Sequence, residues 1–386
     1  MNFDEIKRKE DGYQLNTYAK LPISIEMGEG AYVYDSEGNR YLDLYGGHAV
    51  ALTGHCHPAV VREVKEQLDR LIFYSNVVYS SVRADASMEL IGVAPKGLDK
   101  VFFCNSGAES NETALKIARR YTGRRKILAM KGGFHGRTLG ALSATALGDY
   151  RSKFEPLLGD FEFMEFGNER DAEKFISEEV AAVILEPIQS MAGVEMAEDN
   201  YYRKLRELCT ARGTLLIFDE VQTGLGRTGS WFFGDGIGVI PDIITLAKGA
   251  GGGIPVGAVL IAENVSKTIK QGEHGSTFGG GPVAMAAVRA NIRVIKEEKL
   301  VENTRAMGEY IAGELKNIPV VKRMRGKGLL LGIELYVEAK EVRDFLFSKG
   351  ILTGTSANAH VLRLLPPLIL KKEDVDFFTG ILKEYG

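Results

Sequence analysis

Short, uninterrupted runs of apolar residues recur through the first two thirds of the chain and predict buried β-strands. They lie at 101–103 (VFF), 126–130 (KILAM), 181–186 (AAVILE), 215–219 (LLIFD), 243–247 (IITLA) and 256–261 (VGAVLI). Runs of this length without polar alternation are typical of strands covered on both faces. Residues 109–121 carry apolar side chains at helical spacing, which predicts a helix with one apolar stripe. Alternating strands and helices indicate an α/β domain with a mostly parallel sheet and a ligand site at the carboxyl ends of its strands.

The pattern differs at the two ends of the chain. After about residue 280, long helical segments are followed by GLLLGIEL at 328–335 and HVLRLLPPL at 360–368, which predicts a smaller α+β domain over 281–386. Near the start, AYVYDSEGNRYLDL at 31–44 alternates around a polar turn and predicts a β-hairpin. We expect residues 1–45 to join the small domain and residues 46–280 to form the large one.

Composition narrows the class of protein. Among 386 residues, 48 basic and 51 acidic side chains give a net charge of −3, without the basic excess that is typical of nucleic-acid or anionic-membrane binders. The cysteines Cys56, Cys104 and Cys209 are scattered outside any CxxC pattern, so neither a disulfide framework nor a zinc site is expected. No signal peptide or membrane-spanning run is recognisable, and we expect a cytoplasmic protein without nucleic-acid or membrane partners.

The first stretch with candidate chemistry is the junction of the strand and the helix around residues 101–120. The strand enters a turn of Ser106, Gly107 and Ala108 and leaves as a helix. Glycine permits close approach of a ligand to the backbone, and the free N–H groups of a helix start favour an anion such as phosphate. The alternative is that Asn105 or Ser106 only caps the helix.

Two further predicted strands are followed by, or end in, a charged residue. LLIFD ends in Asp219, and the next apolar strand ends just before Lys248. A carboxylate at the end of a buried strand needs a cation or a donor, and a lysine in a desolvated pocket can form a Schiff base. Each residue alone is also consistent with a solvated side chain. Together, a phosphate cradle, an acid for a pyridinium nitrogen and a Schiff-base lysine are what pyridoxal 5′-phosphate requires.

With these motifs the chain resembles the class III pyridoxal-phosphate-dependent aminotransferases, most closely the branch of N-acetylornithine and ornithine aminotransferases. The resemblance extends from NTYAKLP at 16–22 to LRLLPPL at 362–368. It implies a fold type I enzyme, in which helices sandwich a mostly parallel seven-stranded sheet beside a smaller α+β domain. It also implies a homodimer with active sites at the subunit interface.

The resemblance assigns a role to each motif around the cofactor. Lys248 matches the lysine that forms the Schiff base and moves the proton, and Asp219 matches the acid at the ring nitrogen. The remaining residues implied for cofactor binding are Ser106, Gly107, Ala108, Phe134, Val221, Gln222 and Thr277. Ala108 stands where the family more often has threonine, so backbone N–H groups must replace that hydroxyl. The glycines that follow Lys248 are expected to leave room for it to move.

For the substrate, the resemblance implies Arg137 in GGFHGRTLGA as a carboxylate ligand, together with Ser276, Arg363, Tyr18 and His48. Ser276 and Thr277 belong to HGSTFGGGP at 274–282, which in the family crosses to the neighbouring subunit.

Two substrate positions depart from the family. Met191 in EPIQSMAGV replaces the glutamate that masks the second arginine, here Arg363. Arg363 is therefore expected either to be permanently available to carboxylates or to be masked by another group. Because an unpaired buried cation is costly, a solvated or ligand-occupied Arg363 is favoured. His48 stands where isoleucine or tyrosine is common, either as a substrate neighbour or as a structural residue. His55 and His57 in GHCHP lack further ligands nearby, and no metal is expected.

The expected reaction moves the distal amino group of an N-acylated ornithine, most simply N2-acetylornithine, to 2-oxoglutarate, giving the semialdehyde and glutamate. The acyl group and the natural donor stay open. One alternative is a broader ω-aminotransferase acting on ornithine, a carrier-linked lysine, 4-aminobutyrate or a diamine. Another is an aminomutase or racemase on the same fold. A nucleotide-binding oxidoreductase is disfavoured, because no GxGxxG follows the first strand.

Overall fold

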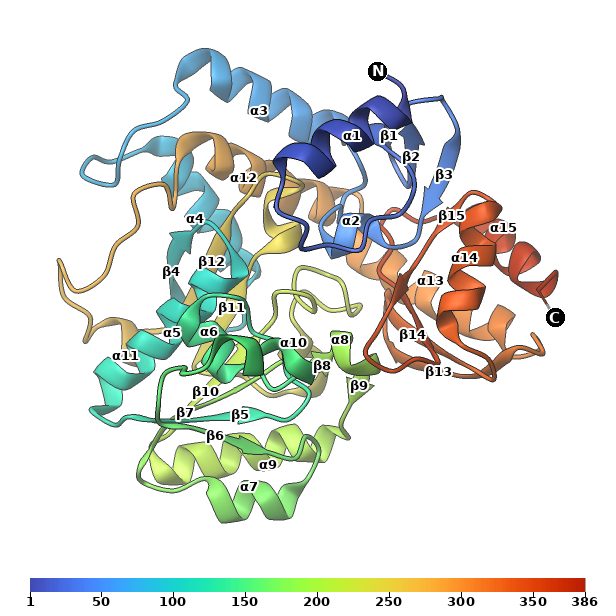
Figure 1. The fold of residues 1–386 in the computed structure, drawn as a ribbon. Coiled ribbons are helices and arrows are strands. Elements are labelled where there is room, and N and C mark those ends of the chain that lie inside the picture. The colour runs from blue at the N-terminus through green and yellow to red at the C-terminus, as the bar shows by residue number, and fades with distance from the viewer. Residues whose placement is uncertain (386) are drawn as a thin grey trace.

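The computed structural model describes residues 1–385, and Gly386 lies outside the described part. A seven-stranded sheet forms the centre of the large domain (Figure 1). Its strands, in spatial order, are β4 (Leu98–Cys104), β12 (Gly257–Ala262), β11 (Ile243–Leu246), β10 (Leu215–Asp219), β7 (Val180–Leu185), β5 (Lys126–Met130) and β6 (Phe161–Met164). Only β12 runs antiparallel to its two neighbours, so the predicted α/β class with a mostly parallel sheet is confirmed.

All six predicted strands of the large domain are present, and the seventh strand, β6, was missed. Its sequence, FEFM, is short and alternates with a glutamate, and it pairs only with β5 at the sheet edge. An edge strand is partly exposed and therefore lacks the continuous apolar run of the central strands.

The predicted helix at 109–121 is confirmed as α5 (Gly107–Thr122), which begins two residues earlier. Ser106 caps it by accepting the Glu109 N–H at 3.2 Å, and Gly123 ends it with φ of +69°. Both terminal residues are of the type that helix ends favour. Its apolar stripe packs on strands of the central sheet, so the first turn is held at the carboxyl end of β4.

Further helices surround the central sheet. They are α3 (Pro58–Arg70), α4 (Ser81–Val93), α6 (Leu139–Ala144), α7 (Glu169–Phe175), α9 (Asp199–Arg212), α10 (Phe233–Ile237), α11 (Glu263–Ser266) and α12 (Pro282–Glu297). Helix α12 packs along α3 and α4, while α7 packs against α9 on the other side of the domain (Figure 1). In residues 1–385, no helix combines the length and apolar character needed to span a membrane.

The C-terminal part contains a second, antiparallel sheet. Its strands are β13 (Val321–Lys327), β14 (Leu330–Leu335), β17 (Val361–Leu364) and β16 (Gly354–Thr355). The helices α13 (Leu300–Leu315), α14 (Ala339–Ser348) and α15 (Lys372–Lys383) lie beside this sheet (Figure 1). These elements match the α+β pattern expected after residue 280.

Three strands of the N-terminal segment and one strand of the C-terminal part form a third sheet. After helix α1 (Phe3–Tyr13), the strands are β1 (Ile25–Glu29), β2 (Tyr32–Asp35) and β3 (Arg40–Asp43). The predicted hairpin is the antiparallel pair β2 and β3. Strand β15 (Ile351–Leu352) joins parallel to β3, with Ile351 opposite Leu42. The start of the chain thereby lies against the small domain.

Candidate active site

A cavity of about 370 Å³ opens at the carboxyl ends of β4, β10 and β11. Eight of the predicted site residues line it: Ser106, Gly107, Ala108, Phe134, Asp219, Val221, Gln222 and Lys248. Strands β10 and β11 are adjacent and parallel, and their register pairs Asp219 with Thr245. This register explains how Asp219 and Lys248 reach one cavity, since both follow the same end of neighbouring strands.

The carboxylate of Asp219 is buried and held by three donors. The Asn111 side chain donates to Oδ2 at 2.7 Å, His135 Nδ1 lies 2.8 Å from the same oxygen, and the Val221 N–H donates to Oδ1 at 3.1 Å. Asn111 in turn accepts a hydrogen bond from Thr245 at 2.7 Å. The carboxylate is thus fixed in orientation at the cavity wall.

The sequence reasoning missed both Asn111 and His135. His135 belongs to the quoted GGFHGRTLGA motif, so its neighbours Phe134 and Arg137 pointed to it. Asn111 is a fully buried polar residue within the apolar stripe of α5. A polar residue in such a stripe was the available signal, because buried amides need partners.

Lys248 lies two residues after the end of β11 and begins a short 3₁₀ turn, Lys248–Gly251, with φ of +43°. Burial lowers the pKa of its ammonium, while the charges of Asp219 and Glu186 act against that shift. A lowered lysine pKa favours the neutral amine, which is the nucleophilic form.

The expectation that the following glycines leave room for Lys248 is wrong for two of them. A Cβ on Gly249 would collide with the Leu52 side chain, and one on Gly251 would lie 2.9 Å from Val256. These positions are glycine because the chain packs closely there. Only Gly253, with φ of +111°, has open space around it.

Glu186 is a buried carboxyl group of the site that the sequence reasoning did not single out. It follows β7, lines the cavity and accepts the Phe134 N–H at 2.8 Å. Burial and the nearby Asp219 raise the pKa of this carboxyl to about 7. Glu186 therefore changes charge near neutral pH, beside Lys248.

The first turn of α5 fits an anion. The Gly107 and Ala108 N–H groups lie where a helix has no intrahelical acceptors for its donors. The Glu109 carboxylate is turned back onto Asn105, accepting its backbone N–H at 3.0 Å and its side-chain amide at 2.8 Å. A Cβ on Gly107 would lie 3.1 Å from Val221, so glycine keeps this corner of the cavity open.

Arg363 on β17 is only 3% exposed, so its guanidinium is not solvated, as was favoured, but is covered by other groups of the chain. It donates to the Thr355 carbonyl at 2.7 Å, to Ser190 Oγ at 3.1 Å and to Tyr45 Oη at 3.0 Å. Burial lowers its pKa. All three acceptors are neutral, so hydrogen bonds rather than a carboxylate hold this arginine.

Met191 and His48 each lie next to a residue that accepts a hydrogen bond from Arg363: Met191 follows Ser190, and His48 contacts Tyr45. Met191 lies in α8 (Ser190–Gly193), and its carbonyl accepts the Ala357 N–H at 2.8 Å. His48 lies in the four-residue α2 (Gly46–Ala49), with Nδ1 at 2.5 Å from Tyr45 Oη. Burial, with repulsion from Lys248 and Arg363, lowers the pKa of His48 to about 4.

The second predicted arginine, Arg137, lies beside Phe134. Arg137 is exposed and stacks over the Tyr150 ring at 4.0 Å and over the Phe134 ring at 5.6 Å. Phe134 lines the cavity, so Arg137 lies beside the cavity. Tyr150, on the 3₁₀ turn Gly148–Tyr150, was not expected at the site.

Besides Arg137, Arg363 and His48, three predicted site residues do not line this cavity. Tyr18 is 77% exposed and Thr277 is exposed. Ser276 lies in a separate hollow with Tyr79 and Arg83, and its Oγ accepts from the Asn105 amide at 3.3 Å. In a single chain these residues remain on the surface.

The histidines of GHCHP have structural partners. His55 bonds Asp43 at 2.8 Å, and His57 bonds Glu298 at 3.0 Å. Across residues 1–385, no group of three or more His, Cys, Asp or Glu side chains is arranged to hold a metal ion.

The geometry of this cavity agrees with comparisons to known proteins. The family model for class III aminotransferases matches residues 13–385. The chain belongs to the class III aminotransferases. It is 47% identical to the acetylornithine aminotransferase of Methanopyrus kandleri, over 95% of each chain. It is 40% identical to the LysW-aminoadipate semialdehyde/glutamate semialdehyde transaminase of Sulfolobus acidocaldarius, over 96% of each chain.

Solved structures agree at the level of the whole chain. An ornithine aminotransferase from Toxoplasma gondii superposes with a TM-score of 0.93 at 32% identity, covering 100% of this chain and 94% of that one. The acetylornithine aminotransferase of Elizabethkingia anophelis gives 0.87 at 30% identity, covering 100% and 98%. This class III aminotransferase is a pyridoxal-phosphate enzyme, and the cavity around Lys248 and Asp219 fits that cofactor.

Proposed function

We propose that this aminotransferase moves the distal amino group of an N-acylated ornithine, N2-acetylornithine in the first instance, to 2-oxoglutarate. The products are the semialdehyde and glutamate. The observation that carries the proposal is the single cavity in which Lys248, Asp219 and the start of α5 meet, with Arg137 and Arg363 nearby. The donor is supported by the name of the Methanopyrus relative and by that of the acetylornithine aminotransferase of Archaeoglobus fulgidus, which is 46% identical over 97% of this chain and 98% of its own.

The roles of the residues follow from their surroundings. Pyridoxal phosphate, when bound, supplies an electrophilic carbon and an electron-accepting ring. Asp219 would hold the proton of the ring nitrogen, since its carboxylate is buried and fixed by Asn111 and His135. Lys248 would bind the cofactor covalently and then carry the proton at its Nζ.

The other cavity residues would position the cofactor. The N–H groups of Gly107 and Ala108, behind the capping residue Ser106, would hold the phosphate. Phe134 and Val221 would cover the two faces of the ring, and Gln222 would approach its hydroxyl side.

Two arginines suit substrates that carry carboxylates. Guanidinium offers paired donors that match a carboxylate, and 2-oxoglutarate has two such groups. Arg137 would take the carboxylate of the donor, and both arginines would take those of 2-oxoglutarate. His48 would face the substrate between Lys248 and Arg363.

A homodimer is part of the proposal. Tyr18, Ser276 and Thr277 would complete the cavity of the neighbouring subunit. Large apolar side chains are exposed near the same segment, among them Phe278 at 64% and Tyr79 at 106%, and such surfaces mark interaction sites. A cytoplasmic location, and the division into 1–45 with 281–386 and 46–280, stay predictions.

A half-reaction screen tests the donor. The cofactor-loaded enzyme is mixed with N2-acetylornithine, N2-succinylornithine, ornithine, 4-aminobutyrate or glutamate, and the visible cofactor absorbance is followed. N2-acetylornithine and glutamate are expected to bleach it fastest. Lys248→Ala is expected to lower turnover by at least about 10⁴-fold, since nucleophile and proton carrier are lost together.

Two outcomes would redirect the assignment. Faster reaction with a lysine linked to an acidic carrier protein would favour the second candidate, which rests on the Sulfolobus relative at 40% identity. A cofactor that glutamate does not convert would point to an isomerase instead.

A further inference from the structure

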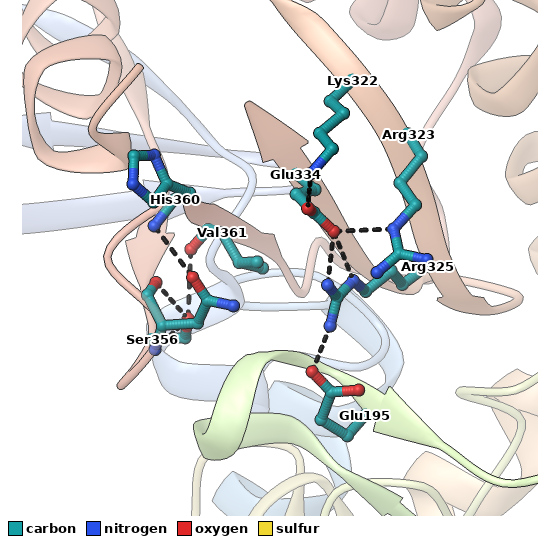
Figure 2. A network of polar contacts seen from close by, with 9 residues as sticks. Glu195, Lys322, Arg323, Arg325, Glu334, Ser356, His360 and Val361 are labelled. Carbon is teal, nitrogen blue, oxygen red and sulfur yellow. Dashed lines mark hydrogen bonds and ion pairs between the residues drawn. The ribbon is translucent and has the colours of Figure 1, made fainter. Parts of the chain in front are cut away.

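The environment of Arg363 differs from that of an arginine masked by an acid. Its acceptors are the Thr355 carbonyl and the hydroxyls of Ser190 and Tyr45. Within residues 1–385, no Asp or Glu forms an ion pair with it, and the acids nearby have other partners. Glu186 accepts from the Phe134 N–H, and Glu195 pairs with Arg325 (Figure 2).

Tyr45 reaches Arg363 from a strained turn. Gly46, Gly47, His48 and Ala49 all have positive φ, between +56° and +70°. His48 and Ala49 pay a conformational cost there that glycine does not. Strain in residues other than glycine persists only where surrounding contacts over-determine the conformation.

Asp43 holds this turn in place. Its Oδ1 accepts the N–H groups of Tyr45 and Gly46, and its Oδ2 accepts that of Gly47, each at 2.9 Å. His55 lies 2.8 Å from the same Oδ2. The turn is therefore built to present Tyr45 and His48 to the region between Lys248 and Arg363.

His48 sets the direction of the Tyr45 hydroxyl. Because burial is the main cause that lowers the pKa of His48 to about 4, the imidazole is neutral at physiological pH. Its Nδ1, 2.5 Å from Tyr45 Oη, accepts the phenolic proton. The lone pairs of Tyr45 Oη then remain for the Arg363 N–H at 3.0 Å.

We propose that Tyr45, oriented by His48, is a specificity-determining residue that occupies Arg363 whenever no substrate carboxylate is bound there. This inference rests on the proposed alternation of a monocarboxylate amine donor and a dicarboxylate acceptor. When a substrate carboxylate displaces the Tyr45 hydroxyl from Arg363, no ion pair is broken. The full charge of Arg363 is therefore available to the carboxylate of the amino acceptor. With the donor bound at Arg137, the hydroxyl stays on Arg363, and the buried Nη2 keeps its hydrogen-bond acceptor.

The test measures binding of glutarate, an unreactive five-carbon dicarboxylate, to the cofactor-loaded enzyme by isothermal titration calorimetry. Pentanoate, of equal length with one carboxylate, is the reference ligand. Tyr45→Phe is expected to tighten glutarate binding about fivefold to tenfold, because no hydroxyl has to be displaced. Pentanoate binding is expected to change less than twofold, and kcat/KM for N2-acetylornithine is expected to fall.

Two further variants separate this role from a structural one. His48→Asn keeps a residue that tolerates positive φ but removes the imidazole, and is expected to tighten glutarate binding by a smaller factor. Met191→Glu supplies an acid and is expected to weaken it by about tenfold or more. Tyr41→Phe, whose hydroxyl bonds Asp35 outside the cavity, is the matched control and should leave glutarate binding unchanged.

The proposal is overturned if Tyr45→Phe and His48→Asn weaken glutarate binding, since Tyr45 would then be a ligand of the substrate carboxylate. Unchanged binding in both variants overturns it as well. If Tyr45→Phe fails to fold, His48→Asn alone decides. Glutarate binding involves no amine transfer, so the result is independent of whether N2-acetylornithine proves to be the donor.

Discussion

The two buried carboxyl groups of this site, Asp219 and Glu186, have different surroundings. Asp219 is surrounded by donors, while Glu186, directly after β7, has only the Phe134 N–H and lies near the Asp219 charge. The pKa of Glu186 is therefore raised above that of an ordinary carboxyl group. A pKa perturbed by burial and a nearby charge in a cavity typically marks a group that handles protons.

Glu186 gives a pH-dependent prediction. Its pKa is about 7 in the folded protein and near 4.3 when unfolded, so the folded state binds the proton more tightly. The free energy of unfolding contributed by this group therefore falls as pH rises from about 4.5 to 7, by about 4 kcal/mol in total. Glu186→Gln should remove this loss, because an amide does not ionise.

Urea unfolding of the cofactor-free protein at several pH values between 5 and 8 measures the effect. The stability of Glu186→Gln relative to the natural protein should increase with pH and level off above 7. Glu66→Gln on the exposed face of α3 is the control and should show no such trend. An equal difference at pH 5 and pH 8 would contradict the assignment.

Helices and strands determine the positions of the site residues more than the local sequence does. Helix α5 supplies the capping Ser106, the Gly107 corner and Asn111 from one rigid body, because its apolar stripe fastens it to the sheet. Its start and length were predictable, since the stripe and the cap both lie in the sequence. The approach of Gly107 to Val221 was not, because it depends on how the β10 loop meets the helix.

Gly107→Ala tests that approach. The added Cβ would lie 3.1 Å from Val221 and should push the loop into the cavity. We expect the affinity for pyridoxal phosphate to fall about tenfold, in line with the cost of overpacking. Equilibrium dialysis measures it.

Gly159→Ala is the matched control for that substitution, because its Cβ would meet open space and its φ is not positive. It should bind the cofactor as tightly as the natural protein. Equal affinity of Gly107→Ala would show that the loop yields without narrowing the cavity.

At the scale of the whole molecule, a charge network joins the small-domain sheet to a two-stranded sheet of β8 (Ile188–Gln189) and β9 (Glu195–Met196). Glu334 on β14 accepts from Lys322 at 2.8 Å, from Arg323 at 2.6 Å and from Arg325. These cations hold the pKa of Glu334 far below its usual range. Arg325 also pairs with Glu195 on β9, so the segment carrying Met191 is tied to the small domain (Figure 2).

Removing the central acid should cost more than removing the outer one. Glu334→Gln leaves three cations facing each other, and we expect it to lower the free energy of unfolding by about 2 to 4 kcal/mol. Glu195→Gln, whose side chain is 45% exposed, should cost less than about 1 kcal/mol. Urea unfolding at pH 7 compares them, and equal losses would contradict a network centred on Glu334.

The sequence by itself determined the α/β class, the six central strands and the meeting of Lys248 with Asp219. Apolar runs specify buried strands, and neighbouring parallel strands bring their carboxyl ends together whatever the loops do. Only the tertiary structure decided how Arg363 is held. Its acceptors come from three distant segments, around residues 45, 190 and 355. No pattern along the chain marks which hydroxyl or carbonyl will accept a hydrogen bond from this arginine, because that depends on which groups folding brings within hydrogen-bond distance.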